Sequence, residues 1–163
     1  MSKYDDLIAG QYANDLKLIA QVGGLYFSQD FRLSNTPTTW RLRLGRYPGK
    51  YDGHPVDIHG YWIYLPGTNK CWQAINRGGG PLQYWNEDGK AAGNPEDWEI
   101  FQFEAVDKHA GTVKISNPSY VIVRAVTGQH PNTMTTPNYI NLVGDQFSCN
   151  DSSPNAAIFR VEF

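Results

Sequence analysis

The chain has 163 residues, of which 18% are charged and 13% aromatic, and its formal net charge is −2. This length suits one domain, and 16 Gly with 10 Pro predict many turns. The sequence has neither a basic stripe nor an apolar run of about 18 residues. We therefore expect no nucleic-acid partner and no membrane span.

The cysteines and the first residues bear on where the protein works. Cys71 and Cys149 are too few for a disulfide framework, so we expect free buried thiols, with a Cys71–Cys149 pair as the alternative. The start of the chain lacks the charged-then-apolar pattern of a signal peptide. The expected location is therefore cytoplasmic, or outside the cell by export without a cleaved signal peptide.

The first 24 residues fit two local structures. Leu7, Ile8, Tyr12, Leu16 and Ile19 form a stripe with helical spacing. Residues 16–19 also read as a strand that leads to a Gly-Gly turn. We favour a short helix or an extended arm before residue 12, followed by strands.

After residue 40 the apolar residues alternate with polar ones at a period of two. Strands are expected over 56–58, 61–65, 100–104, 113–115, 120–124 and 158–163. Turn clusters separate them at 46–53, 76–81, 86–95, 128–137 and 150–155. Short strands between regular turns predict an all-β sandwich or a closed barrel.

Internal repeats decide between these architectures. The offset is 57 positions from Val56 to Val113, 59 from Tyr61 to Tyr120, and 58 from Phe101 to Phe159. A weaker third copy ends at Trp40, because an Asn, a Pro and an aromatic residue precede an alternating strand there, as they do before Phe101 and Phe159.

Three copies of about four strands each predict a β-trefoil, in which a closed barrel carries a cap of hairpins. We place the copies at roughly 1–50, 51–108 and 109–163 of a single domain spanning 1–163. One unit cannot bury its apolar face alone, whereas three units close a barrel and remove most edge strands. Trp40, Phe101 and Phe159 are expected in the barrel core, and a β-sandwich is the alternative fold.

One stretch of the second and third copies carries a family resemblance. Trp98-Glu-Ile-Phe-Gln-Phe-Glu104, followed by Val113-Lys-Ile115 and Tyr120-Val121, resembles the fascin-like branch of the β-trefoils, and the end of the chain repeats the closing strand. The chain departs from that pattern at 117–119 and in a long insertion over 128–137. The branch includes actin-crosslinking modules and sugar-binding relatives, so the resemblance implies a binding domain.

The sequence offers no motif for catalysis or for a cofactor. Asp57 and His59 would share a strand face close to His54, which is typical either of a metal site or of a polar surface beside a turn, and we favour the surface. Glu96, Asp97 and Glu99 lie in turn or strand-edge positions without a defined separation. We therefore expect no enzyme activity, no metal and no cofactor.

Sugar sites combine aromatic faces with amide and carboxylate groups on loops. The second copy has this composition in a predicted hairpin, with the candidate ligand-binding residues Trp72, Asn76, Tyr84, Trp85, Asn86 and Asp88. The third copy offers Asn138, Tyr139 and Asp145, and the first copy Tyr26, Gln29 and Asp30. The alternative is that Tyr84 and Trp85 fill the barrel and its cap.

The favoured function is a non-catalytic, lectin-like, carbohydrate-binding trefoil, multivalent if several copies keep a site. The alternative is a protein-interaction module, either an actin-binding fascin-like trefoil or a protease inhibitor that uses the loop 128–137. Glycans are the favoured partner and a protein is the second, and the oligomeric state is open.

Overall fold

Strands make up almost all of the regular structure in the computed structural model, which describes residues 2–51, 53–74, 80–86, 97–119, 122, 138–150 and 155–163. The elements are α1 (Lys3–Ile8), β1 (Asp15–Ala20), β2 (Tyr26–Phe27), β3 (Leu33–Ser34), β4 (Trp40–Tyr51), β5 (His54–Tyr64), β6 (Lys70–Ala74), β7 (Gly80–Asn86), the 3-10 turn η3 (Asp97–Glu99), β8 (Gln102–Asp107), β9 (Thr112–Asn117), β10 (Asn138–Val143), β11 (Gln146–Asn150) and β12 (Phe159–Glu162). The all-β prediction is confirmed. The strand expected over 120–124 and the loop 128–137 fall outside the described residues, except for Ile122.

Antiparallel strands close a barrel. The pairing runs from β1 to β4, from β4 to β5, from β5 to Phe101 at the head of β8, from β8 to β9, from β9 to β12, and from β12 back to β1. Closure leaves no free edge within this ring, which is the physical advantage that a trefoil offers a chain of short strands.

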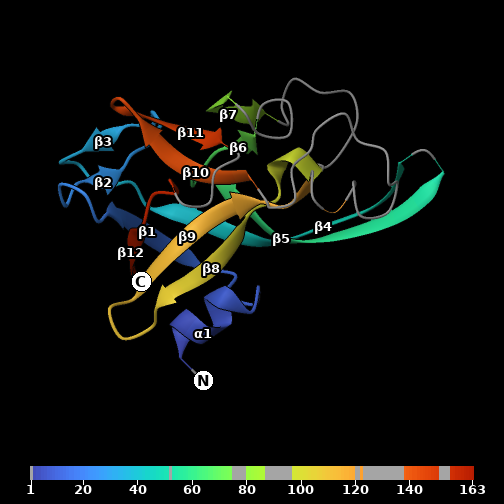
Figure 1. Ribbon diagram of the computed structural model, residues 1–163, viewed down its shortest axis with the longest axis horizontal. Helices are drawn as coiled ribbons and strands as arrows, with labels where there is room; N and C mark the ends of the chain where they lie inside the picture. The colour runs from blue at the N-terminus through green and yellow to red at the C-terminus, as the bar shows by residue number, and fades with distance from the viewer. Residues whose placement is uncertain are drawn as a thin grey trace.

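Three hairpins cap the barrel, each following the first strand of one copy. They are β2–β3, β6–β7 and β10–β11, and they pair with β1, β5 and β9 respectively. In Figure 1 the hairpins lie along the upper side of the barrel and α1 lies below it. This arrangement is a β-trefoil.

The strand registers give the pseudo-threefold equivalences residue by residue. Leu16 pairs with Trp40, Tyr61 with Phe101, and Val113 with Phe159. Six core positions follow from these pairs, and every occupant is buried: Leu16/Tyr61/Val113, Leu18/Ile63/Ile115, Phe27/Trp72/Ile140, Phe31/Leu82/Phe147, Trp40/Phe101/Phe159 and Leu42/Phe103/Val161. The prediction that the closing aromatics Trp40, Phe101 and Phe159 fill the core is confirmed.

The same registers correct the repeat alignment. Tyr61 is the counterpart of Val113, so the offset between the two opening strands is 52 positions, and Val56 is not the equivalent of Val113. The reason is that β4 and β5 pair without interruption from Arg41↔Tyr64 to Tyr51↔His54, which makes a ribbon that projects beyond the barrel (Figure 1). Val56 lies on that ribbon and packs in a separate small core.

The N-terminal segment closes the end of the barrel opposite the hairpins. The predicted short helix is confirmed as α1, capped by the Ser2 hydroxyl, which accepts the Asp5 amide at 3.1 Å. Leu7 is fully buried in the main core, and the Tyr4 hydroxyl donates to the Thr112 carbonyl at 2.7 Å. The Tyr61 hydroxyl accepts the Tyr12 amide at 2.6 Å. The helix therefore belongs to the core.

Two further expectations can be compared with the described part of the chain. Cys71 and Cys149 are both free and buried, as predicted. Among the described residues, no helix has the length and apolarity that a bilayer crossing needs.

Candidate functional site

A polar pocket opens beside the first hairpin, and we call it the first-repeat pocket. It has a volume of about 460 Å³. Its walls come from the turn after β2, the segment before β4, and the turn after β5; the lining residues are Ser28, Gln29, Asp30, Ser34, Thr36, Pro37, Thr38, Thr39, Leu65 and Pro66.

A second pocket occupies the pseudo-equivalent place in the third copy, and we call it the third-repeat pocket. It has a volume of about 340 Å³ and lies between β10–β11, the segment before β12, and the turn after β1. The same three kinds of segment therefore form both pockets. The chemistry differs, because Leu142, Phe147 and Ala157 with Val22 make the third-repeat pocket mainly apolar.

The equivalent place in the second copy is only partly described. Gln73, the counterpart of Ser28, donates to the Glu99 carboxylate at 3.3 Å, and Gln83 donates to Gln73. Glu99 is 3% exposed and is the counterpart of Thr38. A polar network thus stands where the first copy has its pocket.

Hydrogen bonds shape the wall of the first-repeat pocket. The Ser28 hydroxyl, on a residue that is 5% exposed, donates to the Asp30 carboxylate, and the Ser28 backbone N–H donates to the Arg32 carbonyl at 3.0 Å. The Thr38 hydroxyl accepts the Gln29 amide N–H at 2.9 Å. These bonds fix the backbone, while the exposed side chains of Gln29, Asp30 and Thr36 remain at the surface.

The two tryptophans predicted to bind ligand lie in the protein interior. Trp72 is 0% exposed and belongs to the main core, and Trp85 is 7% exposed and packs with Tyr64 and Cys71. Neither ring has a face open to a sugar. For Trp85 this is the alternative given above, that it fills the barrel and its cap, and Trp72 is a core ring as well. The period-two pattern did not show which side of the hairpin each ring takes.

The candidates in the third copy do not form one surface group. Asn138 and Tyr139 are buried, and the Tyr139 hydroxyl donates to the Glu104 carboxylate. Asp145 is exposed at the tip of the hairpin and pairs with Arg32 at 2.9 Å. A ligand site shared by these three residues stays a prediction. The burial of Asn138 and Tyr139, apart from the exposed Asp145 at the hairpin tip, does not favour it.

Three candidates of the second copy lie outside what the structure describes. Asn76 and Asp88 are not among the described residues, and only the backbone of Asn86 is, at the end of β7. Their role in ligand binding stays a prediction.

Gln29 and Asp30, the first-copy candidates, line the first-repeat pocket directly, and among the described candidates of the second copy Tyr84 comes nearest to it. Tyr84 is half-buried, packs against Phe31 with ring centroids 4.5 Å apart, and donates its hydroxyl to the Gln29 carbonyl. Burial, and then the nearby Asp30 carboxylate, raise the pKa of the Tyr84 hydroxyl. A residue assigned to the second copy therefore supports the wall of the first-repeat pocket.

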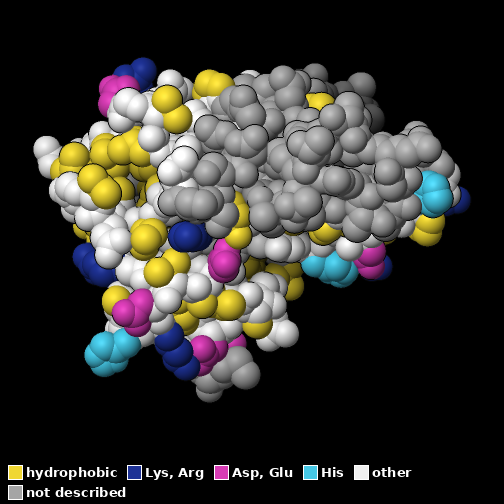
Figure 2. All heavy atoms as spheres, viewed as in Figure 1, with side chains coloured by type: hydrophobic (Ala, Val, Ile, Leu, Met, Phe, Trp, Pro, Cys, Tyr) yellow, Lys and Arg dark blue, Asp and Glu magenta, His cyan; other side chains and the backbone are white. Residues whose placement is uncertain are grey.

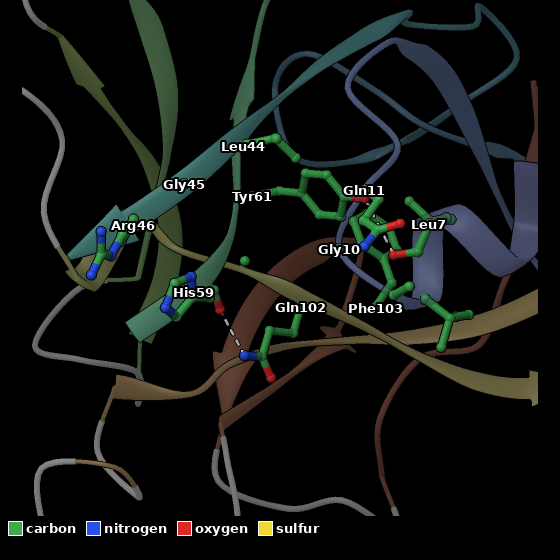
Figure 3. Close-up of a pocket in the computed structure, with 13 residues that line it drawn as sticks. Leu7, Gly10, Gln11, Leu44, Gly45, Arg46, His59, Tyr61, Gln102 and Phe103 are labelled. Atoms are coloured by element: carbon green, nitrogen blue, oxygen red, sulfur yellow. Dashed lines mark hydrogen bonds between the residues drawn. The ribbon is translucent and has the colours of Figure 1, made fainter. Parts of the chain in front are cut away.

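A larger cavity of about 640 Å³, the α1 pocket, lies between α1, the base of the ribbon, and β8 (Figure 3). Leu44 and Tyr61 line it together with His59, Gln11 and Gln102. The Gln102 amide donates to the His59 carbonyl at 2.8 Å, so these two polar groups of the wall are bonded to each other. Its floor includes Gly60, where an added Cβ would come within 2.5 Å of the Phe101 carbonyl oxygen, so only glycine fits this barrel contact.

The charged groups at the rim of the α1 pocket neutralise one another. Arg46 binds both oxygens of Asp57 at 2.9 and 3.0 Å, and His59 Nε2 lies 3.1 Å from the same carboxylate. The predicted shared face of Asp57 and His59 is confirmed. Among the described residues, no group of three or more His, Cys, Asp or Glu is placed to hold a metal ion.

This ion pair gives a pH-dependent prediction. Arg46, and then His59, lower the pKa of Asp57 from its usual value to about 2. Because the folded-state pKa is depressed, the pair stabilises the fold above pH 4 and loses its effect as the pH falls toward 2. In Arg46→Met we expect the Asp57 pKa to rise toward its ordinary value of about 4. A carboxyl NMR titration measures it, and an unchanged pKa would mean that Arg46 is not the cause.

The fold and the pocket define an all-β trefoil domain with a shallow polar pocket beside its first hairpin. No protein-family model matches the chain, and no curated relative matches it. Among solved structures, the chain is similar to SeviL, which was determined bound to the asialo-GM1 saccharide. The TM-score is 0.52 at 11% sequence identity, over 91% of this chain and 96% of that one. At this identity the similarity concerns the fold.

Proposed function

We propose that the protein is a non-catalytic carbohydrate-binding domain and that the first-repeat pocket holds the glycan. The observation that carries this proposal is the composition of the pocket. Amide, carboxylate and hydroxyl groups stand on a wall held by the Ser28 and Thr38 bonds, and Leu65 and Pro66 supply an apolar side. The saccharide bound by SeviL, a protein of similar fold, adds support.

The chemistry of this pocket suits a sugar. A pyranose presents hydroxyl groups around its edge and C–H bonds on its faces, so it needs donors and acceptors beside a small apolar surface. Gln29 offers an amide that donates and accepts, and Asp30 offers a charged acceptor. Thr36 lines the same pocket and carries a hydroxyl that can donate and accept. We propose that these three side chains bind the hydroxyls and that Leu65 and Pro66 contact a C–H face.

The sites of the pseudo-threefold copies are proposed to be unequal. The third-repeat pocket has an apolar wall, so it lacks the acidic and hydroxyl-rich set of the first. The first-repeat pocket would therefore carry most of the binding free energy. Avidity would arise only if the second copy, which retains Gln73 and Glu99, binds as well.

A matched pair of substitutions tests the function and its place together. We expect calorimetry against a panel of neutral mono- and oligosaccharides to give a saturable signal that falls at least about tenfold in Gln29→Ala. The control is Gln11→Ala, an equally exposed glutamine that lines the α1 pocket, and it should bind as the parent does. Loss of binding in Gln11→Ala alone would move the glycan to the α1 pocket.

A blank panel would instead favour a protein partner. The resemblance of the closing strands to the fascin-like branch is the sequence feature that supports this alternative, and the projecting β4–β5 ribbon gives it a surface (Figure 1). On the face shown in Figure 2, the described basic side chains lie beside acidic ones rather than gathering in one patch. Actin cosedimentation and a protease-inhibition panel would then be the next measurements.

A further inference from the structure

The first-repeat pocket has an uneven charge. Asp30 is the one ionisable side chain among the residues that line it, and no Lys, Arg or His belongs to that set. The basic residue next along the chain, Arg32, is directed to the tip of the third hairpin, where it pairs with Asp145 at 2.9 Å. The pocket therefore presents one uncompensated negative charge to a ligand.

The position of that charge is fixed by the fold. The Ser28 hydroxyl donates to Asp30 Oδ1, and Ser28 itself is held in the interior by its backbone N–H, which donates to the Arg32 carbonyl at 3.0 Å. Among the described residues, no group donates a hydrogen bond to the second carboxylate oxygen of Asp30, Oδ2. One carboxylate oxygen is thus anchored and the other is available, which is the geometry of an acceptor for a sugar hydroxyl.

We infer that the first-repeat pocket selects neutral glycans over anionic ones, so that sugars carrying a sialic acid, uronic acid or sulfate group at the bound position are rejected by Asp30. This inference rests on the proposed function. A hydroxyl gains a charge-assisted bond from the carboxylate. A second anion about 5 Å away is repelled by roughly fourfold in affinity at the dielectric of water, and by much more where protein displaces water.

The test compares a neutral oligosaccharide that binds with its counterpart carrying one added carboxylate, by calorimetry on the parent and on Asp30→Asn. We expect the parent to prefer the neutral sugar by at least about tenfold. In Asp30→Asn the preference should fall below about threefold, because the neutral sugar loses its charge-assisted bond and the acidic sugar, no longer repelled, gains affinity. Raising the salt to about 0.5 M should shrink the preference of the parent, because exposed charges are then screened.

Asp5→Asn is the matched control, since Asp5 lies on α1 and pairs with Lys108, outside the pocket. It should keep the full preference. Equal affinity for both sugars in the parent would overturn the inference while leaving the proposed function in place, and so would a preference that survives in Asp30→Asn, because shape would then be the cause. Binding of neither sugar would remove both proposals.

Discussion

Replacing Phe27 by alanine should lower the free energy of unfolding by about 3–5 kcal/mol, among the largest effects of any single substitution in this chain. Phe27 is fully buried and contacts five other rings: Phe31, Trp40, Trp72, Phe147 and Phe159. These rings come from all three copies, so the cavity would open where the copies meet. Urea denaturation followed by tryptophan fluorescence measures the loss.

Phe163→Ala is the matched control for Phe27→Ala. Phe163 is 44% exposed and makes an edge contact with Tyr12 at 5.0 Å. Its loss should cost less than about 1 kcal/mol. If Phe27→Ala cost no more than this control, the six ring positions would not form one continuous core, and the trefoil packing derived from the strand registers would be wrong.

Much of the architecture was predictable because trefoil copies share a hydrophobic pattern. Each closing strand begins with an aromatic residue that must enter the barrel, and Trp40, Phe101 and Phe159 carry this signal at nearly constant spacing. The hairpin of the second copy was predicted from its composition and its turn residues, whereas the hairpins β2–β3 and β10–β11 were not. Because the barrel core requires large apolar residues at these positions, the pattern can be recognised in a single sequence.

The extent of the β4–β5 ribbon could not be predicted. Residues 54–60 alternate as barrel strands do, yet they pair only with β4 outside the ring. A period-two pattern indicates that one face of a strand is buried, but it does not indicate which element buries that face. Val56 and Ile58 are covered by Ile100 in a small separate core, and this shifted the expected repeat alignment by several residues.

The candidate site shows a second limit of prediction from the sequence. Composition directed attention to hairpins rich in aromatic and amide residues, but Trp72 and Trp85 are interior rings. A trefoil needs one large apolar residue in each second strand, and Trp72 meets that need as Phe27 and Ile140 do. The sequence did not single out the first-repeat pocket, because its walls combine residues 28–39 with Leu65 and Pro66, which follow β5. Only Gln29 and Asp30 had been noted there.

The pseudo-symmetry also explains why the pockets differ in polarity. Ser28, Gln73 and Asn141 occupy one equivalent position, whereas Thr38, Glu99 and Ala157 occupy another. The core positions are apolar in every copy because burial demands it. Ser28, Thr38, Glu99 and Asn141 are buried as well, yet they are polar and differ in residue type between copies, so binding chemistry is expected to differ from copy to copy.

Leu7→Ala should cost about 2–5 kcal/mol in unfolding free energy, because α1 is part of the core rather than an appended arm. Leu7 is fully buried at the end of the barrel that α1 closes. Its helix is held by the Tyr4 bond to Thr112 and by the Tyr61 hydroxyl, which donates to the Asp6 carbonyl at 3.3 Å and whose pKa burial raises to about 12. Denaturant titration measures the effect, with the exposed Leu44→Ala, at 57% exposure, as the matched control expected to change stability by less than about 0.5 kcal/mol. Equal effects of the two substitutions would show that α1 only rests on the barrel, and that the barrel is stable without it.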